Sequence, residues 1–97
     1  MNLYEASQKA LEIAEKRGIN ETTIEALKHC ASEVVEAVNA YNDWTYMQAE
    51  EIEFERELAD IVICVLSISA KENINIEKAI ANKMLINEGR AKNGLCK

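Results

Sequence analysis

Apolar residues recur every three or four positions over most of the chain, which is the period of an amphipathic helix. The first such stretch predicts a helix from about Leu3 to Arg17. Gly18 follows it and can adopt the left-handed conformation that closes a helix. The predicted apolar stripe of this helix consists of Leu3, Ala6, Ala10, Ile13 and Ala14.

A second helix is predicted to end near Tyr41. Asn20 or Thr22 can cap its start, and Thr22 followed by Glu25 three residues later has the pattern of a capping box. The segment "NDWTYMQ" is then expected to form the main loop of the chain.

A third helix is predicted to start between residues 48 and 52 and to end near Lys71. Asn73 tolerates the left-handed conformation, and Asn75 can cap the helix that follows. The last helix is expected to run from Ile76 to about Glu88, before a loosely ordered tail from about residue 91.

The composition supports helices throughout, because the 97 residues include no proline and only three glycines. A chain of this length forms one domain. The sequence therefore predicts a single all-α domain of four helices spanning residues 1–97.

The charge balance of 17 acidic against 11 basic residues, a net charge of −6, argues against a nucleic-acid partner. Cys30, Cys64 and Cys96 are odd in number and show no CxxC spacing, so we expect reduced thiols. The apolar run at 61–70 is far shorter than the ~20 residues of a membrane span, and the first residues lack an apolar signal core. A soluble, cytoplasmic protein without a membrane partner is expected.

Acidic residues divide the second helix into two faces. Glu33 and Glu36 lie on one side with alanines and His29. Small neighbours allow another helix or a ligand to come close, although a solvated face with alanines would have the same pattern. The opposite stripe is apolar and consists of Leu27, Ala31, Val34, Val35 and Val38.

The third helix is apolar on nearly all sides after its first turns, which is typical of a buried helix. Four short helices hardly cover it, so a homo-oligomer is expected. Glu57 and Asp60 point the same way as the buried residues of this helix. They are either acids of a first turn with Arg56 or a lysine as counter-ion, or part of a ligand site.

The two helices carry the same pattern, Glu33-x-x-Glu36 and Glu57-x-x-Asp60. Packed antiparallel, they form a cluster of four carboxylates, which suits Mg²⁺ or Mn²⁺. A di-iron bundle requires Glu-x-x-His ligands, which are absent from the sequence. His29, the only histidine, is expected beside the site or at the surface, and not as a ligand.

In their order, the segments "SEVVEAVNAYNDW", "ELADIVICVLSIS" and "INIEKAIANKMLINEGR" resemble the MazG-like all-α nucleoside triphosphate pyrophosphohydrolases, which are related to dimeric dUTPases and dCTP pyrophosphatases. The resemblance covers about residues 27–90. It implies a four-helix-bundle fold, a homodimer or dimer of dimers, and magnesium bound by the two acidic pairs. Single ExxE motifs are common, whereas the ordered set of three is much more specific.

The resemblance also implies hydrolysis of a nucleoside triphosphate to the monophosphate and pyrophosphate. Glu36 is expected to orient the attacking water, and the K-x-x-x-N-x-x-R pattern of Lys83, Asn87 and Arg90 to bind phosphates. Without the motif, these cations are ordinary helix-end residues. Two departures, Ser32 where many members have a second glutamate and Ala91 in place of tyrosine, leave the preferred nucleotide open.

Recognition of the base is less readable from the sequence. Trp44 is a candidate for stacking on the base, although a lone tryptophan is more commonly a core or interface anchor. Two other functions stay open: a non-enzymatic acidic helical-bundle adaptor, and phosphoribosyl-ATP pyrophosphohydrolase within the same superfamily. The role, housecleaning of damaged nucleotides or control of a nucleotide pool, also stays open.

Overall fold

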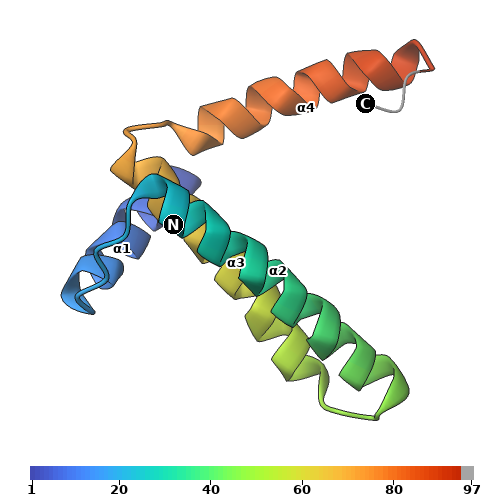
Figure 1. Ribbon diagram of the computed structural model, residues 1–97. Helices are drawn as coiled ribbons and strands as arrows, with labels where there is room; N and C mark the ends of the chain where they lie inside the picture. The colour runs from blue at the N-terminus through green and yellow to red at the C-terminus, as the bar shows by residue number, and fades with distance from the viewer. Residues whose placement is uncertain (95–97) are drawn as a thin grey trace.

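The computed structural model describes residues 1–94, which contain four helices and no strands (Figure 1). The predicted all-α class is therefore confirmed. Within the described range, none of the helices combines the length and the hydropathy that crossing a membrane requires. Cys96 and the end of the predicted tail lie outside the described residues. The helices are α1 (Leu3–Lys16), α2 (Thr23–Tyr46), α3 (Glu51–Lys71) and α4 (Ile76–Lys92).

Local sequence signals set the starts of α2 and α4, as predicted. The Thr22 hydroxyl accepts a hydrogen bond from the Glu25 backbone N–H at 3.1 Å, and the Glu25 carboxylate accepts one from the Thr22 N–H at 2.9 Å. This capping box satisfies two N–H groups that a helix start leaves without partners. The Asn75 side chain caps α4 in the same way, accepting from the Lys78 N–H at 3.1 Å.

The turns after α1 and α3 also follow the prediction. Gly18 has a φ of +74° and Asn73 a φ of +57°, so both adopt the left-handed conformation. Glycine does so at no steric cost, and asparagine is among the residues that tolerate it best.

The predicted end of α2 near Tyr41 is wrong, because the helix continues to Tyr46 through most of the expected loop. Aromatic contacts stabilise these extra turns. The Trp44 and Phe54 rings stack with centroids 5.9 Å apart, and Tyr41 meets Phe54 edge-on at 5.3 Å. Contacts between α2 and α3 thus override the local loop signals of the segment.

The predicted end of α4 near Glu88 is also wrong, because the helix passes through Gly89 and ends at Lys92. A glycine inside a helix costs only about 1 kcal/mol relative to alanine, which the surrounding helix-forming residues offset. The residue that closes α4 is Gly94, with a φ of +74°.

Helix α3 packs against both α1 and α2. The buried residues at these contacts are mostly small, so the helices approach closely: Ser7, Ala10, Ala37, Leu66, Ser69 and Ala70. On α2 the acidic face with its alanines is the one that packs on α3, which decides between the two interpretations of that face. The apolar stripe of α2 is left open, with Val34 46% and Val38 54% exposed.

Helix α4 lies apart from the other three helices and runs away from the α2–α3 pair (Figure 1). Its main packing partner is α1. The Leu3 backbone N–H donates a hydrogen bond to the Glu77 carboxylate at 3.3 Å, at the start of both helices. The rest of α4 therefore has little support from its own chain.

Candidate metal centre

The packing of α2 on α3 brings three of the four predicted ligand carboxylates together. One carboxylate oxygen from each of Glu33, Glu36 and Glu57 lies within 4.8 Å of the other two. The i, i+3 spacing places Glu33 and Glu36 on neighbouring positions of one helical face, and Glu57 approaches them from α3. A cation of the size of Mg²⁺ contacts each oxygen ligand at about 2.0–2.1 Å. Three oxygens within 4.8 Å of one another are therefore nearly close enough to bind one such ion together.

Two oxygens of this cluster are buried and have no hydrogen-bond partner among the described residues, Glu33 Oε2 and Glu57 Oε2. Buried carboxylate oxygens are normally paired, because an unpaired one loses its hydration without compensation. The other oxygen of Glu33 is held by His29, whose Nε2 lies 3.0 Å from Glu33 Oε1. The cluster therefore presents unsatisfied oxygens to a cation while its histidine contact fixes one carboxylate in place.

The carboxylates of the cluster lie close together, and among the described residues no lysine or arginine pairs with them. Burial raises the pKa of Glu33 above its usual value, and the nearby charges of Glu36 and Asp60 raise it further, while His29 opposes them. The pKa of Glu57 is raised first by loss of hydration and then by Glu36, Asp60 and Glu33. Each shift reports a cost of keeping the carboxylate ionised in the folded protein, a cost that a bound cation removes.

These shifts predict a pH dependence of stability for the metal-free protein. Both pKa values are raised above the ordinary value of 4.5, so between pH 4.5 and the folded-state values the folded protein holds more protons than the unfolded chain. In that window the free energy of unfolding falls as the pH rises. We expect denaturant titrations in EDTA to show this fall for the wild type and a flatter profile for Glu33→Gln/Glu57→Gln. Parallel profiles of the two proteins would contradict the assignment.

Asp60, the fourth predicted ligand, is exposed and lies beside the three glutamates, not within their closest cluster. It lines a cavity of about 370 Å³ together with Glu33 and His29. The remaining walls come from α1, the segment after it and α3 and are largely apolar, and they include one arginine, Arg17. Asp60 thus lies between the glutamate cluster and this largely apolar cavity.

On the other side of the cluster, Glu36 and Glu57 line a second cavity of about 280 Å³ near the α2–α3 loop. Asp43 and Glu53 add two more acids to its walls. Glu36 itself is exposed, so water has access to its carboxylate. This geometry is compatible with the expected role of Glu36 toward a water molecule.

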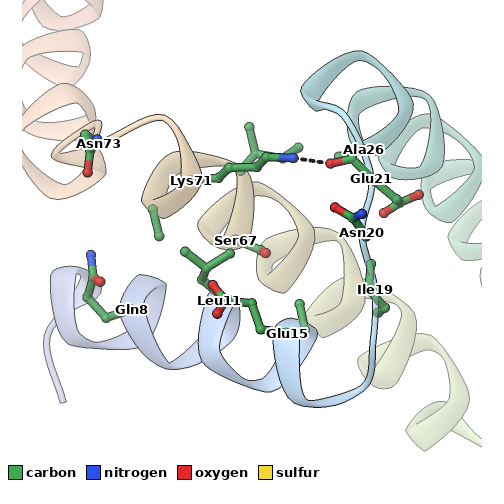
Figure 2. Close-up of a pocket in the computed structure, with 13 residues that line it drawn as sticks. Gln8, Leu11, Glu15, Ile19, Asn20, Glu21, Ala26, Ser67, Lys71 and Asn73 are labelled. Atoms are coloured by element: carbon green, nitrogen blue, oxygen red, sulfur yellow. Dashed lines mark hydrogen bonds between the residues drawn. The ribbon is translucent and has the colours of Figure 1, made fainter.

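A third cavity, of about 540 Å³, contains none of these acids. Figure 2 shows it between α1, the linker before α2 and the end of α3. The Lys71 ammonium donates a hydrogen bond to the Glu21 backbone carbonyl at its rim. This contact ties α3 to the linker, and we assign the cavity no part in the metal centre.

The two described cysteines are free and lie near the cluster, Cys30 on α2 and Cys64 on α3. Burial raises the pKa of the Cys64 thiol to about 11, with a further contribution from Cys30. With this raised pKa the Cys64 thiol keeps its proton near neutral pH, whereas a metal binds the thiolate. The anionic groups that cluster here are carboxylates, and these suit a hard cation.

The structure does not bring the predicted phosphate-binding residues to this cluster. Lys83, Asn87 and Arg90 lie on α4, which runs away from α2 and α3 (Figure 1). Arg56, a possible counter-ion for the acids of α3, lies 3.3 Å from Glu53 instead. Within residues 1–94, no lysine or arginine forms an ion pair with any of the four predicted ligands.

Trp44 is part of the aromatic cluster with Tyr41 and Phe54 and is only partly exposed. This placement suits an anchor between α2 and α3. Its predicted stacking on a base stays a prediction.

The contact between His29 and Glu33 goes beyond what the sequence predicted, which was only that His29 lies beside the site or at the surface. The i, i+4 spacing of the two residues was the available signal, since side chains four residues apart are neighbours on a helix. His29 Nδ1 also lies 3.6 Å from a carboxylate oxygen of Glu21, so the ring stands between two acids. Arg17 gave no signal, because its place in the cavity depends on how α1 packs.

The chain matches no protein-family model, no curated protein and no solved structure. The resemblance to the MazG-like enzymes therefore depends on the sequence motifs alone.

Proposed function

We propose that the protein is a Mg²⁺-dependent nucleoside triphosphate pyrophosphohydrolase, which converts a nucleoside triphosphate to the monophosphate and pyrophosphate. The observation that carries the proposal is the meeting of Glu33, Glu36 and Glu57 across two helices, with two buried oxygens that have no partner. This is the arrangement expected if the two acidic motifs share a cation. Mn²⁺ suits the same ligands.

The carboxylates fit a hard divalent cation by their chemistry and their lack of other partners. Glu33, Glu36 and Glu57 would hold it, while Asp60 lies beside them and its charge acts on both Glu33 and Glu57. When bound, such ions neutralise the triphosphate, polarise the α-phosphorus and lower the pKa of a bound water.

The chain's own residues have further roles in this proposal. His29 fixes the orientation of the Glu33 carboxylate through their 3.0 Å contact. Glu36, which is open to water, orients the attacking water or accepts its proton. The apolar cavity bounded by Glu33 and Asp60 receives the nucleoside, because the phosphates would be bound at the neighbouring acids.

The decisive experiment measures Mg²⁺-dependent release of pyrophosphate from ribo-, deoxyribo- and modified nucleoside triphosphates and from phosphoribosyl-ATP. We expect turnover of at least one of them and its loss in EDTA. Mg²⁺ alone should also raise the melting temperature, since a ligand at 100 times its Kd stabilises the folded state by about 2.7 kcal/mol. No turnover with any substrate and no Mg²⁺ effect on melting would refute the proposal.

The exposed apolar residues of α2 and α3 favour a second candidate, a non-enzymatic adaptor that binds a partner protein through them. Val35 is 60% exposed and Val62 is 52% exposed. The same assay separates the two functions, because an adaptor folds and binds its partner without any turnover.

A further inference from the structure

Within residues 1–94, Ser67 on α3 is the one serine whose hydroxyl does not bond to its own helix. All four serines lie in helices. A helical serine often donates to a backbone carbonyl three or four residues earlier, and Ser7, Ser32 and Ser69 do so at 2.7–2.8 Å. The Ser67 side chain takes part in none of the hydrogen bonds among the described residues. Its hydroxyl is therefore available to a bound molecule.

Ser67 lies where two cavities meet. The cavity of about 370 Å³ beside Glu33 and the cavity of about 540 Å³ have three lining residues in common, Ala14, Ile19 and Ser67. Figure 2 shows Ser67 on α3 opposite the linker that carries Ile19. The Ser67 side chain is only partly buried, so it borders open space on the side of each cavity.

The smaller cavity extends from the metal centre to Ser67. Asp60 and Ser67 both line it, and they lie on the same face of α3 because they are seven residues apart. Seven residues correspond to about 10 Å along a helix. A ribose and its base together extend over a comparable distance. A nucleotide whose phosphates are bound at the acids therefore places its base beside Ser67.

The walls of this cavity offer a base few other neutral hydrogen-bonding groups. Ile13, Ala14, Ile19 and Ile63 are apolar. Of the lining residues that the structure describes, Ser67 alone carries an uncharged hydroxyl or amide side chain. In a mostly apolar ligand pocket, a small number of placed polar groups determine orientation and specificity. The edge of a base carries donors and acceptors, and a hydroxyl can pair with either.

We propose that Ser67 is a specificity-determining residue, whose hydroxyl hydrogen-bonds the edge of the nucleotide's base in the cavity beside the metal centre. The inference rests on the proposed function, because it takes this cavity as the site of the nucleoside. A base whose edge presents no matching group leaves a polar group without a partner, and this lowers its binding. The wild type should therefore prefer one base over the others.

Ser67→Ala tests the proposal through the preference among substrates. We compare kcat/KM for the ribo- and deoxyribonucleoside triphosphates of adenine, guanine, cytosine and uracil. The value for the favoured base should fall about fivefold, which is the usual effect of one hydrogen bond, while the value for the least favoured base stays unchanged. An equal fall for all bases, as a purely structural effect would give, or an unchanged preference would overturn the proposal.

Ser69→Ala is the matched control. This variant also loses a serine hydroxyl of α3, but one that is bonded to the Val65 carbonyl. It should keep the wild-type preference, and a narrowed preference here too would assign the effect to packing of α3 and contradict a contact of Ser67 with the base. The affinity for Mg²⁺ should be the same in both variants and in the wild type, because neither serine belongs to the glutamate cluster.

A second measurement does not depend on turnover. ¹H–¹⁵N spectra are recorded with Mg²⁺ and each of the four nucleoside 5′-monophosphates, AMP, GMP, CMP and UMP, as probes. We expect the amide signals of Ile19 and Ser67 to shift most with one base, and Ser67→Ala to weaken the binding of that monophosphate by about the same factor. No shift of either signal with any probe would refute recognition of the base at Ser67.

These results separate the two proposals. A wild type without turnover, whose Ile19 and Ser67 signals still respond to one base, refutes the pyrophosphohydrolase alone. Turnover in which Ser67→Ala keeps the wild-type preference refutes the role of Ser67 alone.

Discussion

Replacement of Glu57 by glutamine is expected to reduce Mg²⁺-dependent pyrophosphate release by at least about 100-fold, because groups that merely support a metal ligand already cost 10- to 100-fold when removed. The glutamine has almost the same size but lacks the negative charge. Glu57 contributes one of the three clustered oxygens, and its buried Oε2 has no hydrogen-bond partner among the described residues, so the carboxylate is free to bind a cation. Steady-state kinetics measure the loss of pyrophosphate release, and calorimetric titration with Mg²⁺ measures the loss of metal binding.

The same variant should unfold at a higher temperature than the wild type when both are metal-free. The raised pKa of Glu57 arises from lost hydration and from the charges of Glu36, Asp60 and Glu33, and a neutral side chain removes these costs. A gain in stability together with a loss of activity distinguishes a functional carboxylate from a structural one. Glu55→Gln, an exposed acid on the same helix, is the control and should change neither property.

Full activity in Glu57→Gln and in Asp60→Asn would refute the metal assignment. Asp60→Asn alone has a smaller expected effect, because Asp60 lies beside the cluster and not within it.

The sequence predicted most helix ends, because they depend on residues that act locally. The capping box of Thr22 and Glu25, the left-handed Gly18 and Asn73, and the Asn75 cap are each visible within a few positions of the chain. The end of α2 was missed since it depends on Trp44 meeting Phe54, which belongs to another helix.

The spacing of the acids also predicted much of the candidate site. An i, i+3 pair lies on one face of any helix, so Glu33 and Glu36 meet Glu57 once α2 and α3 pack antiparallel. The position of α4 relative to this cluster could not be predicted, because it depends on how α4 packs on α1.

The apolar pattern of α2 does not predict which face of this helix packs on α3. An apolar stripe usually faces the core of its own domain. Here Ala37 of the acidic face is 6% exposed, whereas Val38 beside it is 54% exposed. Small residues let α3 come close enough for the carboxylates to meet, and the larger side chains are left for another surface.

Exposed apolar side chains form one continuous face on the α2–α3 pair. The spacings of i, i+4 and i+7 place them in a stripe on each helix, and none of them lines either cavity beside the acids. The face therefore lies away from the metal centre. Its members, with exposures between 39% and 54%, are Leu27, Val34, Val38 and Tyr41 on α2 and Leu58, Val62 and Val65 on α3.

A face of this kind is expected to pack against its copy in a homodimer, where two α2–α3 pairs form a four-helix core. Val62→Glu should then weaken the dimer by at least about 100-fold, because burial of an unpaired carboxylate costs several kcal/mol and each 1.4 kcal/mol is a factor of ten. Light scattering coupled to gel filtration should show a dimer or larger assembly for the wild type and a monomer for this variant.

Two controls separate loss of the interface from loss of the fold. Val62→Ala keeps the face apolar and should remain a dimer with a modestly raised dissociation constant. Ser32→Glu adds the same charge at an exposed position of α2 outside the apolar face and should leave the assembly intact. A wild type that is monomeric and fully folded at micromolar concentration would contradict the interface.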